Sequence, residues 1–142
     1  MNIVFDMDNT LADEVGATKR PGIDQLLAKL QSEGHTLSLW TNSTRERART
    51  ILRDHDLMRY FNSSIFREDY DPDSKGIGKD IRTINGDLLV DDDPKQIEYV
   101  KSIKKKGVLV KAYRKDMKIA DTKKIYEAIR SQQALIYRIL GR

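Results

Sequence analysis

Cysteine is absent from this 142-residue chain, which excludes disulfides, thiolate zinc sites and cysteine nucleophiles. The only histidines are His35 and His55, and they lack the spacing of a metal-ligand pair. Long hydrophobic runs are also missing, because no apolar stretch approaches the roughly 20 residues of a membrane-spanning helix. The first ten residues have no basic segment ahead of an apolar one and do not resemble a secretory signal. We therefore expect a cytoplasmic protein that does not associate with membranes.

Charged residues, in contrast, are abundant. They make up 34% of the chain, against 39% apolar residues, which is typical of a small globular protein, and the length predicts a single domain over residues 1–142. The charge is uneven, because residues 101–142 hold 13 Lys and Arg but only 3 Asp and Glu. This basic segment could bind a polyanion or form solvated helix faces, and its apolar residues at helical spacing favour the second interpretation.

Short apolar runs alternate with longer stretches of helical periodicity. We expect strands at residues 3–5, 36–40, 64–66, 87–91 and 108–112, and a loop over residues 69–78. Helices are expected from Pro21 to Gly34, from Ser43 or Thr44 to about His55, from Asp93 to Gly107, and from about Asp121 onward. Strands that alternate with helices predict parallel βαβ units in a three-layer α/β fold.

Polar side chains follow three of the expected strands. Asp6 to Thr10 come after the first strand, Thr41 to Ser43 after the second, and Asp91 to Asp93 end the fourth, with Lys79 shortly before that strand. Because ligands bind at the carboxyl ends of parallel strands, we expect these groups to meet at one edge of the sheet.

The chemistry of this set points to phosphoryl transfer. An all-oxygen donor set favours a hard cation, most plausibly Mg²⁺. Hydroxyl and amide groups that lead into a helix N-terminus suit phosphate oxygens, and Lys79 adds a fixed positive charge. Asp6 and Asp8 project to the same side of an extended backbone, so one can attack phosphorus while the other moves protons.

The segment from Asp6 to Leu11 resembles the DxDxT signature of the haloacid dehalogenase superfamily. Trp40 to Ser43, Lys79, and Val90 to Asp92 resemble its second, third and fourth motifs, in the same order. The resemblance covers residues 3–112 and implies a Rossmann-like three-layer α/β/α sandwich with a central parallel sheet. It also implies a Mg²⁺-dependent phosphatase, because Asp8 stands where the dehalogenating members lack an acid/base.

The resemblance further implies roles for the first motif. Asp6 would be the nucleophile and a metal ligand. Asp8 would be the general acid/base, and its backbone carbonyl would also reach the metal. Thr10 would brace this loop within the phosphate site.

The other motifs would complete the site. Thr41 and the backbone amide of Asn42 would bind the phosphoryl group, and Lys79 would neutralise the phosphate and the nucleophile. Asp92 would bind the metal. Asp91 is the alternative, because three consecutive aspartates leave open which of them aligns with the metal ligand of the fourth motif. Asp93 is expected to cap the following helix.

Several segments are similar to the NLI-interacting-factor-like branch of the superfamily: Lys19 to Gly22, Thr41 to Glu46, Ile65 to Glu68, Lys79 to Ile81, and Val90 to Pro94. That branch contains phosphatases of the C-terminal domain of RNA polymerase II and magnesium-dependent phosphatases that prefer phosphotyrosine. This chain departs from the pattern, because Asn42 replaces the usual alanine and the interval from Lys79 to Asp91 is short.

Neither interval between the first three motifs has room for a cap domain, although residues 12–20 could form a short flap. A capless site suits a bulky or exposed phosphoester such as a phosphoprotein or an aryl phosphate. Two alternatives remain: a phosphatase for nucleotides or phosphorylated nucleic-acid ends, and a non-catalytic module that recognises phosphate. The sequence leaves open whether the protein is a monomer or a homodimer.

Overall fold

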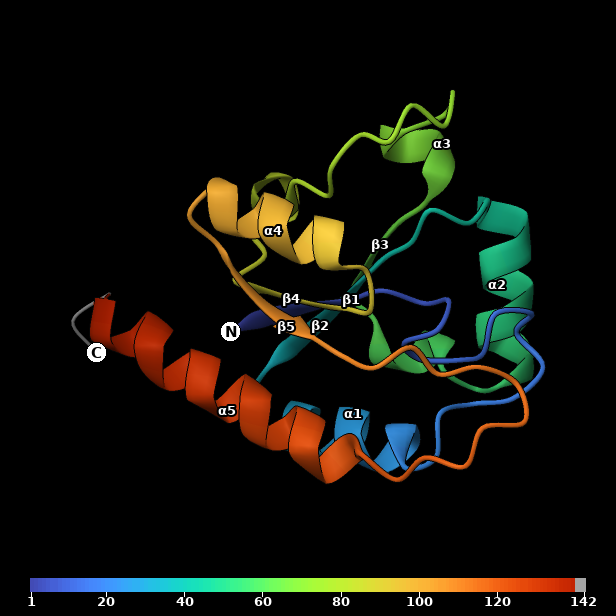
Figure 1. Ribbon diagram of the computed structural model, residues 1–142, viewed down its shortest axis with the longest axis horizontal. Coiled ribbons are helices and arrows are strands. Elements are labelled where there is room, and N and C mark those ends of the chain that lie inside the picture. The colour runs from blue at the N-terminus through green and yellow to red at the C-terminus, as the bar shows by residue number, and fades with distance from the viewer. Residues whose placement is uncertain (140–142) are drawn as a thin grey trace.

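A five-stranded parallel sheet forms the centre of the computed structural model, which describes residues 1–139 (Figure 1). The strand order is β3-β2-β1-β4-β5. The strands are β1 (Asn2–Phe5), β2 (Thr36–Trp40), β3 (Ser63–Ile65), β4 (Leu88–Asp91) and β5 (Lys106–Leu109). All four strand pairings are parallel. The chain moves outward from β1 in one direction through β2 and β3, and in the other through β4 and β5, so the strand order switches beside β1.

Helices cover both faces of this sheet. The longer ones are α1 (Ile23–Ser32), α2 (Arg45–Asp54), α4 (Pro94–Ser102) and α5 (Thr122–Ile139). Shorter turns of helix are η1 (Met58–Tyr60), α3 (Arg67–Tyr70) and η2 (Ile81–Ile84). In Figure 1, α1 and α5 lie together on one side of the strands and α4 lies on the other. The expected three-layer Rossmann-like α/β/α architecture is therefore confirmed.

Two apolar clusters separate the layers, because successive side chains of a strand point to opposite faces. Ile3 and Phe5 of β1 face the larger cluster, with the apolar sides of α1, α2 and α5. Val4 faces the smaller cluster, with Ile97 and Val100 of α4. The middle strands are buried on both faces, which explains why their sequences are nearly continuous apolar runs.

The C-terminal helix is partly a core element. Ile125, Ile129 and Ile136 are buried, as the helical spacing of the apolar residues in this segment predicts, whereas Leu135 and Ile139 are exposed. The approach of α5 to α1 is close: a Cβ at Gly22 would stand 2.6 Å from the Thr122 hydroxyl oxygen. Gly22 also has a φ of 83°, so a side chain is disfavoured there for two reasons.

The predicted boundary between α4 and β5 is wrong. The helix ends at Ser102, ahead of the three consecutive lysines at 104–106. Strand β5 occupies Lys106–Leu109 instead of the predicted residues 108–112. Lys104 has a φ of 68°, and this left-handed turn reverses the chain within a few residues. Gly107 lies inside β5, where a Cβ would stand 3.0 Å from Ile97 of α4, so the glycine permits close helix–sheet packing instead of ending a helix.

The intervals between the motifs contain no additional folded unit in the described part of the chain. Between Thr10 and Thr41 lie only α1 and β2, and between Asn42 and Lys79 lie α2, β3 and the short helices η1 and α3. The fold is therefore capless, as expected. Within residues 1–139, no helix has the length and apolar character needed to cross a membrane.

Candidate active site

The carboxyl edge of the sheet positions the loop from Asp6 to Thr10. The Asp6 N–H donates to the Val90 carbonyl at 3.0 Å, which extends the pairing of β1 with β4 by one step. The chain then turns back, because Thr10 and Leu11 both donate to the Met7 carbonyl, and Asn9 adopts a left-handed φ of 65°. Asp6 therefore has the rigidity of the sheet, whereas the residues after it belong to a turn.

A buried arginine, Arg20, binds the backbone of this turn. Arg20 donates from Nε to the Thr10 carbonyl at 2.7 Å and from Nη2 to the Asn9 carbonyl at 3.0 Å. Its Nη1 binds both carboxylate oxygens of Asp121, at 2.9 and 2.8 Å, and Nη2 also reaches the Lys111 carbonyl. One side chain thus links the loop after β1 to the segment between β5 and α5.

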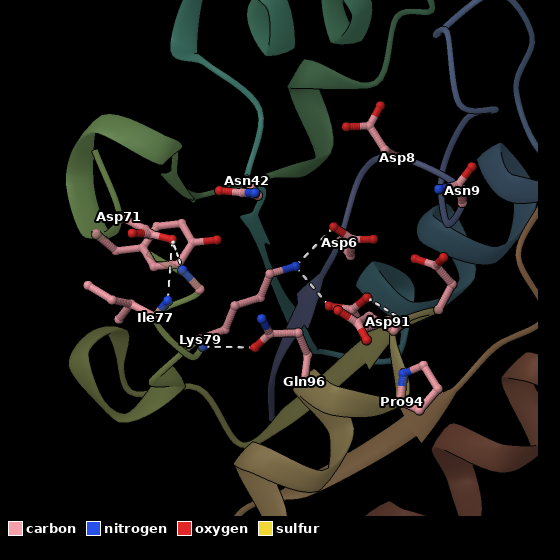
Figure 2. Close-up of a pocket in the computed structure, with 14 residues that line it drawn as sticks. Asp6, Asp8, Asn9, Asn42, Asp71, Ile77, Lys79, Asp91, Pro94 and Gln96 are labelled. Carbon is pink, nitrogen blue, oxygen red and sulfur yellow. Dashed lines mark hydrogen bonds and ion pairs between the residues drawn. The ribbon is translucent and has the colours of Figure 1, made fainter. Parts of the chain in front are cut away.

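Three carboxylates meet at the switch in strand order. Asp6, Asp91 and Asp92 each place one oxygen within 4.8 Å of the others. The Lys79 ammonium lies between two of them, 3.0 Å from Asp6 Oδ1 and 2.8 Å from Asp91 Oδ2 (Figure 2). Asp6, Lys79 and Asp91 are buried, whereas Asp92 is partly exposed.

The proton affinities of this cluster reflect its burial. Burial raises the pKa of Asp6 to about 6, although the Lys79 charge acts in the opposite direction. Burial and the Asp6 charge raise the pKa of Asp91 to about 7, and burial also raises the pKa of Asp92. Burial lowers the pKa of Lys79, but Asp6 and Asp91 outweigh it, so the net shift is upward and the ammonium stays charged.

The cluster fits a divalent cation of the magnesium type. Its donors are all carboxylate oxygens, which hard cations prefer. Three ionised carboxylates beside one lysine leave two negative charges unbalanced, and one divalent ion would offset them. Asp92 has the freer carboxylate, because both oxygens of Asp91 are engaged, by Lys79 and by the Asp93 N–H.

The two threonines of the predicted phosphate site are buried and do not line the cavity. The Thr10 hydroxyl donates to Asp6 Oδ2 at 3.2 Å and lies 3.4 Å from Asp92 Oδ1, so it braces the carboxylates. The Thr41 hydroxyl accepts from the Ser43 N–H at 3.0 Å and shapes the loop after β2. Asn42 is exposed and does line the cavity.

Asp8 points away from the carboxylate cluster, toward α2 (Figure 2). Both of its oxygens accept from Arg47, each at 3.0 Å. The same guanidinium donates to the Ser43 hydroxyl at 2.9 Å. The ion pair fixes Asp8 at the rim of the cavity, on the side of the loop that carries Asn42.

The site opens into a cavity of about 410 Å³. Its polar wall holds Lys79 and the acidic residues, and its apolar wall includes Tyr70, Ile77 and Pro94. Tyr70 also packs edge-to-face on Trp40, with ring centroids 5.3 Å apart, and Trp40 is buried. The cavity can therefore hold a phosphate at its base with an organic group against the apolar wall.

The pattern of NLI interacting factor-like phosphatases matches residues 1–135 of the chain. The chain belongs to this phosphatase family. A search of curated proteins found no match. The family explains why the motifs occur in the observed order, and it makes the chain an NLI interacting factor-like phosphatase of the haloacid dehalogenase type.

Solved structures share the fold of this NLI interacting factor-like phosphatase at low sequence identity. A Thermotoga maritima protein assigned as a beta-phosphoglucomutase aligns with a TM-score of 0.69 and 16% identity, over 92% of this chain and 98% of that one. A Had-superfamily hydrolase from Ehrlichia chaffeensis aligns with a TM-score of 0.63 and 15% identity, over 92% and 96%. A chain of the Pnkp1/Rnl/Hen1 complex aligns with a TM-score of 0.57 and 14% identity, over 78% of this chain and 45% of that one. These similarities show the fold alone.

The roles of three residues at or beside the candidate site were not predicted from the sequence: Gln96, Arg20 and Arg47. Gln96 accepts from the Lys79 N–H at 2.9 Å and so positions the lysine. It stands three residues after Asp93, which caps α4 by accepting from the Lys95 N–H, as expected. That spacing is typical of a capping box. It does not predict that the Gln96 side chain instead accepts from the Lys79 N–H, 17 residues away in the sequence. The contacts of Arg20 and Arg47 likewise join segments that are far apart in the sequence.

Proposed function

We propose that this phosphatase is a Mg²⁺-dependent phosphomonoesterase that works through a phosphorylated Asp6. The observation that supports it best is the cluster of Asp6, Asp91, Asp92 and Lys79, all but Asp92 buried, at the base of an open cavity. A cation held by Asp6, Asp92 and Asp91, with the Asp8 carbonyl, would supply positive charge that offsets the carboxylates and polarises the phosphoryl group.

In the first step, a carboxylate oxygen of Asp6 forms a bond to phosphorus, and the bond from phosphorus to the ester oxygen breaks. The departing oxygen takes its proton from Asp8, which lines the rim of the cavity and acts in its protonated form, turned away from Arg47. Lys79, 3.0 Å from Asp6, orients the nucleophile and balances the charge of the phosphoryl oxygens. Asn42 binds those oxygens from the loop that Thr41 shapes.

In the second step, a water molecule attacks phosphorus and gives a proton to Asp8. The bond between phosphorus and Asp6 breaks, which releases phosphate and restores the carboxylate. Thr10 keeps Asp6 and Asp92 in place through its hydroxyl during both steps. The whole catalytic unit is contained in one domain, and its open rim suits a bulky or exposed phosphoester such as a phosphoprotein or an aryl phosphate.

Replacement of the nucleophile tests the proposal. Asp6→Asn preserves the shape of the side chain but removes the attacking charge, so hydrolysis of p-nitrophenyl phosphate should be abolished. The wild-type protein should lose activity in excess EDTA and regain it with MgCl₂. Circular dichroism and thermal unfolding of the variant serve as the control for folding. Wild-type activity in Asp6→Asn, or full activity in EDTA, would contradict the mechanism.

A further inference from the structure

A second cavity of about 440 Å³ lies beside the catalytic one. The two cavities share Asp8 and Asn42 as lining residues. The second cavity extends from them toward the N-terminus of α2, and Arg47 and Arg67 also line it. A substrate whose phosphate sits at the base of the first cavity can therefore extend into the second without leaving the protein surface.

The charges of the second cavity are not equally available. Arg47 is engaged, because its guanidinium binds Asp8, the Ser43 hydroxyl and the Glu14 carbonyl. The Glu14 carboxylate is engaged as well, by the Lys115 N–H at 2.9 Å and by Arg114 at 3.7 Å. The fixed charges of these groups are thus largely compensated.

Arg67 is the exception. Its N–H donates to the Ser43 carbonyl at 3.0 Å, and its Nε donates to the Asn42 carbonyl at 2.8 Å. These two bonds fix the side chain against the loop that borders the phosphate. Within residues 1–139, the two terminal nitrogens of this guanidinium have no hydrogen-bond acceptor and no ion-pair partner. A preoriented pair of N–H donors therefore remains free at the wall of the second cavity.

We propose that Arg67 forms a second anion subsite and that the preferred substrates carry a second phosphate or carboxylate close to the phosphate that is hydrolysed. The planar fork of a guanidinium matches the oxygens of either group and can bind them through two parallel hydrogen bonds. The N-terminus of α2 adds little, because the Arg45 N–H there already donates to the Glu68 carboxylate and the Thr44 hydroxyl caps the Arg47 N–H, so the subsite depends on the Arg67 guanidinium. This inference rests on the proposed function, because it concerns the substrate of the same site.

Three substrates that differ in one group would test the subsite: propyl phosphate, 3-(phosphonooxy)propanoate and propane-1,3-diyl bisphosphate. A hydrogen bond to a charged group predicts that kcat/KM for the bisphosphate exceeds that for propyl phosphate by about 10- to 100-fold. The carboxylate compound shows which anion the fork prefers. Equal kcat/KM values for all three in the wild-type enzyme would overturn the proposal.

The informative variant is Arg67→Gln. The Gln side-chain nitrogen occupies the place of Arg Nε, so it can still donate to the Asn42 carbonyl while the charged fork is removed. We expect the preference for the bisphosphate to collapse in this variant. A merely structural role of Arg67 would lower kcat/KM for all three substrates in parallel. The matched control is Arg53→Gln, which changes an exposed arginine of α2 outside both cavities and should retain the preference.

Binding to Asp6→Asn separates this proposal from the proposed function. Calorimetry with Asp6→Asn should show tighter binding of the bisphosphate than of propyl phosphate, and Asp6→Asn/Arg67→Gln should bind both alike. Discrimination in binding without hydrolysis by the wild-type enzyme would refute the phosphatase mechanism and support the subsite. Hydrolysis of propyl phosphate without any discrimination would refute the subsite alone.

Discussion

At the scale of single residues, Asp6 and Asp8 are two positions apart but stand in opposite environments. Asp6 is buried beside Lys79, with a pKa raised by burial to about 6. Asp8 is half-buried at the rim and bound to Arg47 through both oxygens. The proposed nucleophile thus faces the base of the cavity and the proposed acid/base faces its entrance, where a leaving group and a water molecule would pass.

The Asp8→Asn variant should separate the two chemical steps. p-Nitrophenolate is a good leaving group that needs little protonation, so phosphorylation of Asp6 should still occur, whereas water attack should lose its base. We expect a burst of p-nitrophenolate followed by a steady rate that is about 10²–10⁴-fold below the wild-type rate. Stopped-flow absorbance would record both phases. An unchanged steady rate would remove Asp8 from the mechanism.

The buried carboxylates also predict how stability depends on pH. Asp6 and Asp91 have raised pKa values of about 6 and about 7 in the folded protein, against 3.8 ordinarily. The folded state therefore takes up protons before the unfolded state as pH falls from 8 toward 4. Without metal, the free energy of unfolding should rise over this interval through these two groups.

Urea unfolding in EDTA at pH 8 and pH 5 would measure this effect. His35 acts in the opposite direction, because burial lowers its pKa, so the comparison should include Asp91→Asn, in which the rise is smaller. Saturating MgCl₂ should abolish or reverse the trend, since the ion needs ionised ligands. A metal-free protein that is as stable at pH 8 as at pH 5, with Asp91→Asn behaving identically, would contradict the assignment.

At the scale of elements, one arginine anchors the loop that follows β1. Arg20 is fully buried and pairs with Asp121, which precedes α5, while it also binds the backbone of Asn9 and Thr10. Removal of the guanidinium would leave the Asp121 carboxylate and the Thr10 carbonyl without their donor, whereas the Asn9 carbonyl would keep the Tyr113 N–H. We expect Arg20→Met to reduce the free energy of unfolding by about 3–5 kcal/mol.

Chemical denaturation of Arg20→Met and of Arg59→Met would provide the matched comparison. Arg59 also forms an ion pair, with Asp56, but both side chains are more than half exposed, so its loss should change stability by about 1 kcal/mol or less. Equal effects of the two substitutions would show that the Arg20 cluster does not anchor the loop.

At the scale of the whole molecule, the described chain carries no inserted unit that could cover the cavity. Access to the site should therefore depend little on the size of the group that carries the phosphate. We expect a phosphotyrosine on a surface loop of a folded carrier protein to be hydrolysed with a kcat/KM comparable to that of the same phosphotyrosine in a short peptide. Malachite-green detection of released phosphate would compare the two, and hydrolysis of the free peptide alone would count against an open site.

The sequence by itself determined the strand–helix alternation, the positions where β1, β2 and β4 end, and the identity of the groups placed there. These features depend on local properties: apolar runs mark buried strands, and aspartates after β1 and β4 reach one edge because parallel strands end on the same side. The N-cap role of Asp93 was predictable for the same reason, since it involves only the next two residues.

Only the tertiary structure decided which of these groups touch. Lys79 reaches Asp6 and Asp91, Arg47 turns Asp8 toward α2, and Arg20 joins the first motif to Asp121. The end of α4 also depended on packing. In the sequence Gly107 resembles a helix C-terminal glycine, whereas in the structure it lies in β5 and packs closely against Ile97 of α4. Each of these outcomes is set by contacts between segments that are distant in the sequence, whose geometry follows from the packing of whole layers and leaves no local pattern.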